Sequence, residues 1–150
     1  MIERKSGHIV TISSSAGKTG VSHLTDYCAS KYAARGFDSS LRRELMDLGG
    51  LHKCIKLTCV SPYFINTGMF EGATSSTDLM HKSMGCYFLE PDYVCQEIYD
   101  AIRYEKRDVT LPPELGGALS LEHFLPFWFQ DWATVTACDM RAFVGRHAKH

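Results

Sequence analysis

The chain has 150 residues, which is long enough for one domain that buries roughly two thirds of its unfolded surface. Hydrophobic residues make up 45% of the sequence and charged residues 22%, an ordinary composition for a globular domain. The formal net charge is −1. This charge gives no electrostatic reason to expect nucleic acid or an anionic membrane as a partner, and we exclude nucleic acid.

The cysteine and histidine spacings match no metal site. None of the 6 cysteines belongs to a C-x-x-C pair, and the 7 histidines include no H-E-x-x-H. We therefore expect no bound metal, and reduced, mostly buried thiols in an intracellular protein. From the first residues we expect no signal peptide, and no run of 18 apolar residues predicts a transmembrane helix.

The first predicted element is a buried strand over residues 8–14, where a β-branched run follows a glycine. A turn of small residues and a polar loop come next. Residues 25–48 then show the period of a helix, and Gly49-Gly50 closes it. Apolar side chains recur at three- or four-residue steps and should face the core: Ala29, Ala33, Phe37, Leu41, Leu45 and Leu48.

Two further strands follow, at residues 54–60 and 107–111. Pro62 should end the pairing of the first of them, because proline lacks an N–H. Residues 63–90 are predicted as a long loop, typical of a lid or binding segment, before a helix over 90–104. The alternation predicts an α/β fold with neighbouring parallel strands and the 25–48 helix crossing between the first two.

Tyr27 and Lys31 are the first candidates for chemistry. Their spacing of four places both side chains on one face of the helix, one turn apart. An ammonium beside a phenol stabilises the phenolate, which can then exchange a proton with an alcohol or carbonyl oxygen. The pair alone is weak evidence, since Tyr27 could be a core phenol and Lys31 a solvated helix lysine.

Ser14 strengthens the interpretation because it ends the first predicted strand. Ligands of open α/β sheets bind at the carboxyl ends of strands, so a strand-end hydroxyl and a phenol at a helix start can converge on one oxygen. The turn of residues 61–68 leaves the next strand at the same edge. The alternative is that Ser14 is only a turn hydroxyl and Thr67 only a turn or cap residue.

Three segments together resemble the landmarks of the short-chain dehydrogenase/reductase family. They are Ile9-Val10-Thr11-Ile12-Ser13-Ser14, Tyr27-Cys28-Ala29-Ser30-Lys31, and Val60-Ser61-Pro62 with Thr67. The segment 62–70 is most similar to the microsomal branch acting on retinol and 17β-hydroxysteroids. The family usually has glycine after the turn proline, where this chain has Tyr63, a departure that also occurs in the retinol-type branch.

The resemblance implies a role for each matching residue. Tyr27 would be the general acid/base, and Lys31 would support it while holding the nicotinamide ribose hydroxyls. Ser14 would polarise the substrate oxygen. Pro62, Ile65 and Thr67 would line the nicotinamide, with the backbone of Ile65 and the side chain of Thr67 at its carboxamide. The implied cofactor is NAD or NADP, with only part of its site in this chain.

The glycine-rich turn that binds the pyrophosphate in this family is absent from the sequence, since no G-x-x-x-G-x-G or G-x-G-x-x-G occurs. Gly17-Lys18-Thr19 is no phosphate loop either, because Ile12 stands where that motif needs glycine. We expect a partial Rossmann-like, doubly wound sheet that comprises the last three strands and lacks the N-terminal half. Residues 1–150 would form one truncated catalytic region.

Residues 119–150 form an aromatic-rich tail with a dense apolar run at 124–129 and Trp132. Three interpretations remain open for this tail. It could be a lid over a lipophilic pocket, an interfacial patch with tryptophan at the level of lipid headgroups, or ordinary core packing.

The expected function is hydride transfer between NAD(P) and a lipophilic alcohol or ketone of retinoid or steroid type. The alternative is a catalytically inactive truncated form that acts as an interaction or regulatory fragment. Expected partners are the lipophilic substrate and either a second copy through the 25–48 helix or a full-length relative. The resemblance implies a location at the endoplasmic reticulum membrane or lipid droplets.

Overall fold

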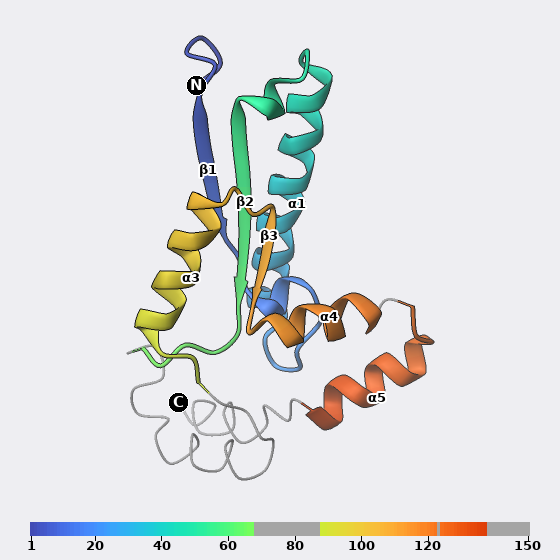
Figure 1. The fold of residues 1–150 in the computed structure, drawn as a ribbon. Coiled ribbons are helices and arrows are strands. Elements are labelled where there is room, and N and C mark those ends of the chain that lie inside the picture. Colours follow the sequence, from blue (N-terminus) through green and yellow to red (C-terminus); the bar gives the residue numbers. More distant parts are fainter. Residues whose placement is uncertain (68–87, 123, 138–150) are drawn as a thin grey trace.

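The computed structural model describes residues 1–67, 88–122 and 124–137 (Figure 1). Much of the predicted 63–90 loop therefore lies outside the described residues. The elements alternate between strand and helix along the chain, as the sequence predicts. They are β1 (Gly7–Ile12), η1 (Ser15–Gly17), α1 (Thr25–Asp47), η2 (Leu51–Lys53), β2 (Ile55–Pro62), α3 (Pro91–Arg103), β3 (Asp108–Leu111), α4 (Pro113–Glu122) and α5 (Phe127–Ala137).

The three strands form one parallel sheet in the order β1-β2-β3. Gly7 to Ile12 pair with Ile55 to Val60, and Cys59 to Pro62 pair with Asp108 to Leu111. The helix α1 crosses between β1 and β2 and packs on both. The predicted parallel α/β architecture is confirmed, and all three carboxyl ends lie at one edge of the sheet.

Strand β2 ends at Pro62, as predicted, although Pro62 itself still pairs with Leu111. Odd-numbered residues donate toward β3: Cys59 N of β2 bonds to Arg107 O (3.0 Å), and Tyr63 N, just after β2, bonds to Leu111 O (2.8 Å). The N–H that proline lacks would therefore point toward the β1 side, where β1 has already ended at Ile12. No hydrogen bond to β3 is lost, so Pro62 can be the last paired residue of β2.

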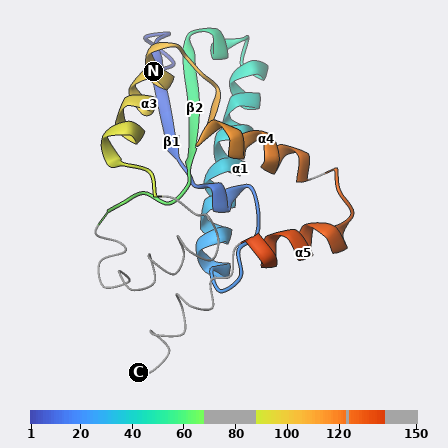
Figure 2. The same ribbon diagram turned by 60° about the horizontal axis from the view of Figure 1, so that its bottom comes forward.

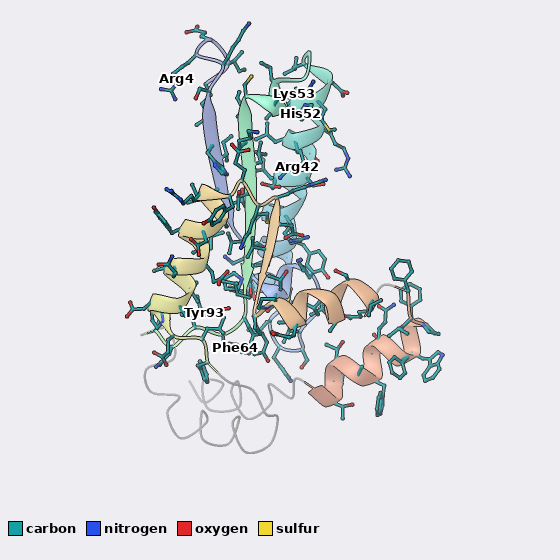
Figure 3. All side chains as sticks on the ribbon, in the orientation of Figure 1. Arg4, Arg42, His52, Lys53, Phe64 and Tyr93 are labelled. Atoms are coloured by element: carbon teal, nitrogen blue, oxygen red, sulfur yellow. The ribbon has the colours of Figure 1, made fainter. Side chains whose placement is uncertain are left out.

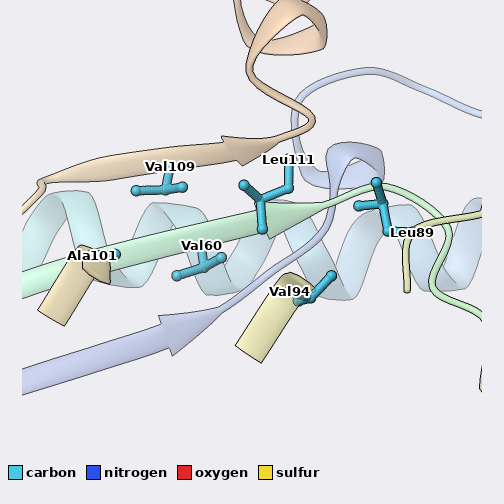
Figure 4. Packing of buried hydrophobic residues seen from close by; sticks show 6 residues of the cluster. All are labelled: Val60, Leu89, Val94, Ala101, Val109 and Leu111. Atoms are coloured by element: carbon cyan, nitrogen blue, oxygen red, sulfur yellow. The ribbon is translucent and has the colours of Figure 1, made fainter. Parts of the chain in front are cut away.

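The face of the sheet under α3 is apolar (Figure 4). Strand residues point alternately to the two faces, and those on this face join the buried side of α3. Val60, Val109 and Leu111 of the sheet pack with Leu89, Val94 and Ala101, and Val10, Tyr63, Ile65 and Ile98 pack at the margin. This cluster is the main core of the described chain.

The face under α1 is apolar only at its amino end, where Leu45 packs on Ile55 and Leu57 with Ile9, Leu41 and Leu51 around them. The predicted apolar stripe of α1 is wrong in its other members. Ala29, Ala33, Phe37 and Leu48 are exposed. Toward the carboxyl end of the sheet α1 instead presents charged side chains, which find polar partners there.

A polar contact ties the edge strand β1 to the central strand β2 on the α3 side. His8 Nε2 lies 2.8 Å from the hydroxyl of Thr58, which is fully buried. The same hydroxyl donates to the carbonyl of Lys106, 2.7 Å away, at the approach to β3. The contact therefore joins β1, β2 and the start of β3.

The segment after β3 forms α4 and α5, which extend away from α3 in both views (Figures 1 and 2). Large apolar side chains of this segment are exposed: Leu121, Phe124, Leu125, Phe127, Trp128, Trp132 and Val135. Ordinary core packing, the third interpretation of the aromatic tail, is therefore wrong for the described residues, and the lid and the interfacial patch stay open. No helix of residues 1–67, 88–122 and 124–137 is long and apolar enough to cross a membrane.

The cysteine prediction is half correct in the described part of the chain. Cys28 and Cys59 are buried, whereas Cys54 and Cys95 are exposed, and all four are free thiols. Cys86 and Cys138 lie outside the described residues. Within the described ranges no cluster of three His, Cys, Asp or Glu side chains could hold a metal ion.

Candidate active site

Ser14 lies at the carboxyl end of β1, and its side chain is held by two contacts. Its hydroxyl accepts a hydrogen bond from Ala16 N (3.2 Å), which makes Ser14 the N-cap of the short helix η1. The same hydroxyl donates to Pro62 O, 3.4 Å away. Ser14 therefore joins the ends of β1 and β2 while its residue is buried.

Tyr27 and Lys31 lie in the first two turns of α1, as the spacing predicts. The Lys31 ammonium is 5.5 Å from the centroid of the Tyr27 ring, within the range of a cation–π contact. Tyr27 N donates to Asp26 Oδ1 (2.8 Å), which orders the backbone at the helix start. The phenol is partly exposed, so it remains accessible to a ligand.

The loop that carries Ser14 is fixed to α1 at Lys31. Ser13 Oγ donates to Lys31 O (2.9 Å). Gly17 lies against the same carbonyl, because a Cβ atom at this position would come within 2.8 Å of Lys31 O. Ser13 and Gly17 were not among the sequence candidates. Their signal would have been the small residues flanking Ser14, which permit this close approach.

The turn after β2 brings the remaining candidates toward the same edge of the sheet. Pro62 ends β2, while Ile65 forms a parallel bridge with Leu89 and is partly buried. Asn66 N donates to Leu89 O (2.9 Å). Thr67 is exposed, and its N donates to Ile65 O (2.8 Å). This backbone pairing holds the turn open beside the strand ends.

A charged network that the sequence did not predict lies between α1 and the sheet. Asp108 of β3 accepts from both terminal nitrogens of Arg35, at 3.2 and 3.3 Å, and from Lys18 Nζ at 3.2 Å. Arg35 Nη1 also donates to Ser61 Oγ (3.1 Å), the residue before Pro62. Lys18 Nζ donates to Thr110 Oγ1 (2.6 Å).

The network shifts the pKa values of its members. Burial alone would raise the pKa of Asp108, but the hydrogen bonds and charge of Arg35, with those of Lys18, hold it below its usual range. Burial alone would lower the pKa of Arg35, but Asp108 outweighs it and raises that pKa. Burial raises the pKa of the Cys59 thiol against the opposing charge of Arg35. The carboxylate and the guanidinium are thus both stabilised as ions.

A second ion pair lies farther along α1, where Arg42 reaches toward the sheet (Figure 3). Arg42 Nη2 donates to Leu57 O (2.9 Å) and to Asp38 Oδ2 (3.3 Å). The Asp38 side chain is 7% exposed and that of Arg42 14%. Asp38 Oδ1 and Arg42 Nε are buried without a hydrogen-bond partner among the described residues. This pair fixes the middle of α1 on β2.

A pocket of about 340 Å³ lies between the loop at residues 18–22, Tyr32 of α1 and α5. Burial, followed by the charge of Glu122, raises the pKa of Tyr32. Ser14, Tyr27 and Lys31 do not line this pocket. The candidate active site is instead the sheet edge where Ser14, Pro62 and the Tyr27–Lys31 pair are placed.

Comparison with known proteins identifies the family of this chain. The sequence profile of the short chain dehydrogenase family matches residues 1–78, which are more than half of the chain. The chain therefore belongs to the short-chain dehydrogenase/reductase family, a family of oxidoreductases.

Two curated relatives come from Homo sapiens. Epidermal retinol dehydrogenase 2 is 44% identical over 126 residues, which cover 84% of this chain and 38% of that protein. The protein 17-beta-hydroxysteroid dehydrogenase 13 is 39% identical over 126 residues, with 84% and 39% covered. The chain thus spans about two fifths of the length of these relatives.

The fold also matches a solved structure. A crystal structure of a short chain dehydrogenase/reductase from Burkholderia phymatum in complex with NAD superimposes with a TM-score of 0.64 at 19% identity. The match covers 83% of this chain and 50% of that chain. It supports the Rossmann-type fold of the described strands and helices.

Proposed function

We propose that residues 1–150 form the catalytic region of an NAD(P)-dependent short-chain dehydrogenase that acts on a lipophilic alcohol or ketone of retinoid or steroid type. The observation that carries this proposal is the Lys31 ammonium, 5.5 Å from the Tyr27 ring, on the helix that follows the loop of Ser14. The names of the two human relatives support the substrate class.

Each candidate residue has one task in this proposal. Tyr27 exchanges a proton with the substrate oxygen, so that its phenolate takes the hydroxyl proton as an alcohol is oxidised. Lys31 stabilises that phenolate and binds the ribose hydroxyls of the cofactor. Ser14 donates a hydrogen bond to the substrate oxygen, for which its hydroxyl must turn away from Pro62 O.

The residues present fit the nicotinamide end of NAD or NADP. Ser14 Oγ and Pro62 O are 3.4 Å apart, so the ends of β1 and β2 meet at the edge where open α/β sheets bind ligands. The backbones of Ile65 and Thr67 follow directly along this edge and would face the carboxamide. When bound, the nicotinamide supplies or accepts the hydride. The pyrophosphate would bind outside this sequence, which contains no glycine-rich cradle.

The test uses an enzyme in which residues 7–150 follow the N-terminal half of a full-length relative, called here the joined enzyme. Tyr27→Phe should lower the turnover of a lipophilic alcohol by roughly 10²–10⁴-fold, since this is the usual worth of a general acid/base. Tyr99→Phe is the matched control, because Tyr99 is an exposed phenol of α3. Equal activity of the Tyr27→Phe variant and the parent would contradict the proposal.

Two further variants separate the roles of the neighbouring residues. Lys31→Ala should lower turnover and weaken cofactor binding together, because Lys31 serves both. Ser14→Ala should lower kcat with cofactor affinity nearly unchanged, because Ser14 contacts only the substrate oxygen. Steady-state kinetics with each substrate varied in turn measures both effects.

The second candidate function is that of an interaction fragment without activity of its own. It is favoured by the outer edge of β1, which has no strand partner within the described residues and can pair with another chain. Co-purification of the separate chain with a full-length relative, with no turnover by the chain itself, would favour this candidate.

We propose two further properties on the same basis. A homodimer would pack through α1, where Ala29, Ala33 and Phe37 form an exposed stripe. Sedimentation of the Phe37→Glu variant and of the parent tests this dimer, because the new charge should shift the variant toward the monomer.

The endoplasmic reticulum membrane or lipid droplets would be the site of action, as the family resemblance implies. Fractionation of cells that express the tagged protein tests the location.

A further inference from the structure

The residue of interest is Asp108, which lies at the first position of β3, outside the segment matched by the family profile. One of its partners, Lys18, is four residues after Ser14 in the same loop. Its other charged partner, Arg35, is four residues after Lys31 and hence one turn along the same face of α1. One carboxylate therefore bridges the two segments that carry the candidate catalytic residues.

The turn after β2 belongs to the same network. Arg35 Nη1 donates to Ser61 Oγ, and Ser61 is fully buried immediately before Pro62. A shift of Arg35 would thus also disturb its hydrogen bond to Ser61, just before the turn after β2. Three chain segments that are far apart in sequence meet at the guanidinium and the carboxylate.

The charges show what Asp108 contributes to this arrangement. Lys18 and Arg35 carry two positive charges, and the Lys18 side chain is only 10% exposed. Without the carboxylate, the two cations would lose their common counter-ion and repel each other. We then expect Lys18, which keeps only its hydrogen bond to Thr110 Oγ1 (2.6 Å), to hold its loop less firmly. The same loop contacts Lys31 O through Ser13 and Gly17.

We propose that Asp108 is a positioning residue that fixes the Ser14 loop against the Tyr27–Lys31 helix by holding Lys18 and Arg35 together. This inference rests on the proposed function for its effect on catalysis. Its structural part, the fixed loop, does not depend on that function. The two parts are therefore tested by separate measurements.

The first measurement is amide hydrogen exchange on the 150-residue chain. The amides of Gly17 and Lys18 are bonded to Ser14 O and Ser15 O at 2.9 and 2.8 Å. In Asp108→Asn, these amides should exchange at least about tenfold faster, while the amides of α3 keep their rates. Unchanged exchange at Gly17 and Lys18 would overturn the proposal, and so would an equal acceleration throughout α3, which indicates general loosening.

The second measurement is kinetics in the joined enzyme. Asp108→Asn should lower kcat by at least about tenfold, because displacements near 1 Å can cost roughly 100-fold. Asp108→Glu should recover much of the loss, since it restores the charge. The control is Glu105→Gln, which removes a similar ion pair of Glu105 with Lys56 (2.7 Å) near the opposite end of β2.

The outcomes separate the two proposals. A kcat of Asp108→Asn within about twofold of the parent would overturn the positioning role, as would a loss that Glu105→Gln reproduces or that Asp108→Glu fails to relieve. An inactive joined enzyme, or one unaffected by Tyr27→Phe, would count against the proposed function instead. Hydrogen exchange would in that case still decide whether Asp108 fixes the loop.

Discussion

The two faces of the sheet are held to their helices by different interactions. On the α3 face, Val60, Leu111 and Val94 are buried among apolar neighbours. On the α1 face, the sheet contacts Arg35 and Arg42, whose partners are carboxylates, hydroxyls and a backbone carbonyl, in addition to the small apolar cluster at its amino end. The helix that carries the candidate catalytic residues is thus oriented by directional polar contacts, and its neighbour by apolar packing.

The difference matters because hydrogen bonds specify geometry, whereas apolar contacts mainly supply burial. If α3 moved along the sheet, its apolar side chains would still contact other apolar side chains. A displacement of α1 would break the pairs of Arg35 and Arg42 at once. A lost ion pair on the α1 face should therefore be compensated by removal of its partner charge. A cavity on the α3 face should be compensated only by new apolar volume.

The largest effect is expected at the buried pair Asp38–Arg42. Arg42→Met leaves the Asp38 carboxylate, 7% exposed, without its counter-ion, and should cost about 3–5 kcal/mol of unfolding free energy. The double variant Asp38→Leu/Arg42→Met should be close to the parent or more stable, because both unpartnered polar atoms disappear. Urea denaturation of the parent and the two variants measures this; a double variant as unstable as Arg42→Met would contradict the expectation.

On the apolar face, Leu111→Ala should cost about 2–5 kcal/mol, because it leaves a cavity in the centre of the cluster where Leu111 is fully buried. Leu121→Ala is the control, since Leu121 is largely exposed on α4. Its effect should stay within about 0.5 kcal/mol. Equal costs of Leu111→Ala and Leu121→Ala in urea denaturation would contradict the expectation.

A smaller effect is expected at the contact between the Ser14 loop and α1. The new methyl group of Gly17→Ala would lie 2.6 Å from Ser13 Oγ and 2.8 Å from the backbone oxygen of Lys31, which cannot move alone. We expect a cost of about 1–3 kcal/mol, typical of overpacking. Gly20→Ala, with no atom within 4 Å of its Cβ, should be neutral or slightly stabilising. Equal thermal midpoints of the two variants would contradict the close approach.

The smallest effect concerns pH. The folded pKa of Asp108 lies below its unfolded value of about 3.9, so its contribution to stability is present at neutral pH and is lost as the pH falls through the folded pKa. Solvent screens the carboxyl, whose side chain is 41% exposed, so we expect less than about 1 kcal/mol. Between pH 7 and pH 3, Asp108→Asn should lose correspondingly less unfolding free energy than the parent; an identical loss would refute this.

Local patterns predicted the strands, the long helix and its glycine stop, because β-branched runs and turn residues act over a few positions. Gly49 and Gly50 do adopt positive φ angles of 69° and 78°. Local patterns failed on the inner face of α1. Arg35 and Asp38 look like solvent-exposed residues in sequence, and the partner of Arg35 is 73 residues away.

In the candidate site, too, local motifs predicted some residues, whereas contacts between distant residues were missed. Ser14, Tyr27 and Lys31 lie in short motifs, and the structure places them at the predicted strand end and helix face. Lys18 and Asp108 belong to no motif, because their relation depends on the parallel register that brings β3 beside β2. Only the three-dimensional fold puts residues 90 positions apart within 3.2 Å.

The contact of His8 with Thr58 has a consequence for the imidazole ring. A hydroxyl has one proton to give, and that of Thr58 goes to Lys106 O, which can only accept. Thr58 must then receive its second hydrogen bond from His8, so Nε2 carries the hydrogen and the neutral ring is the Nε2–H tautomer. Nitrogen chemical shifts of His8 should therefore show a pyrrole-type Nε2 and a pyridine-type Nδ1, whereas Thr58→Val should release that preference.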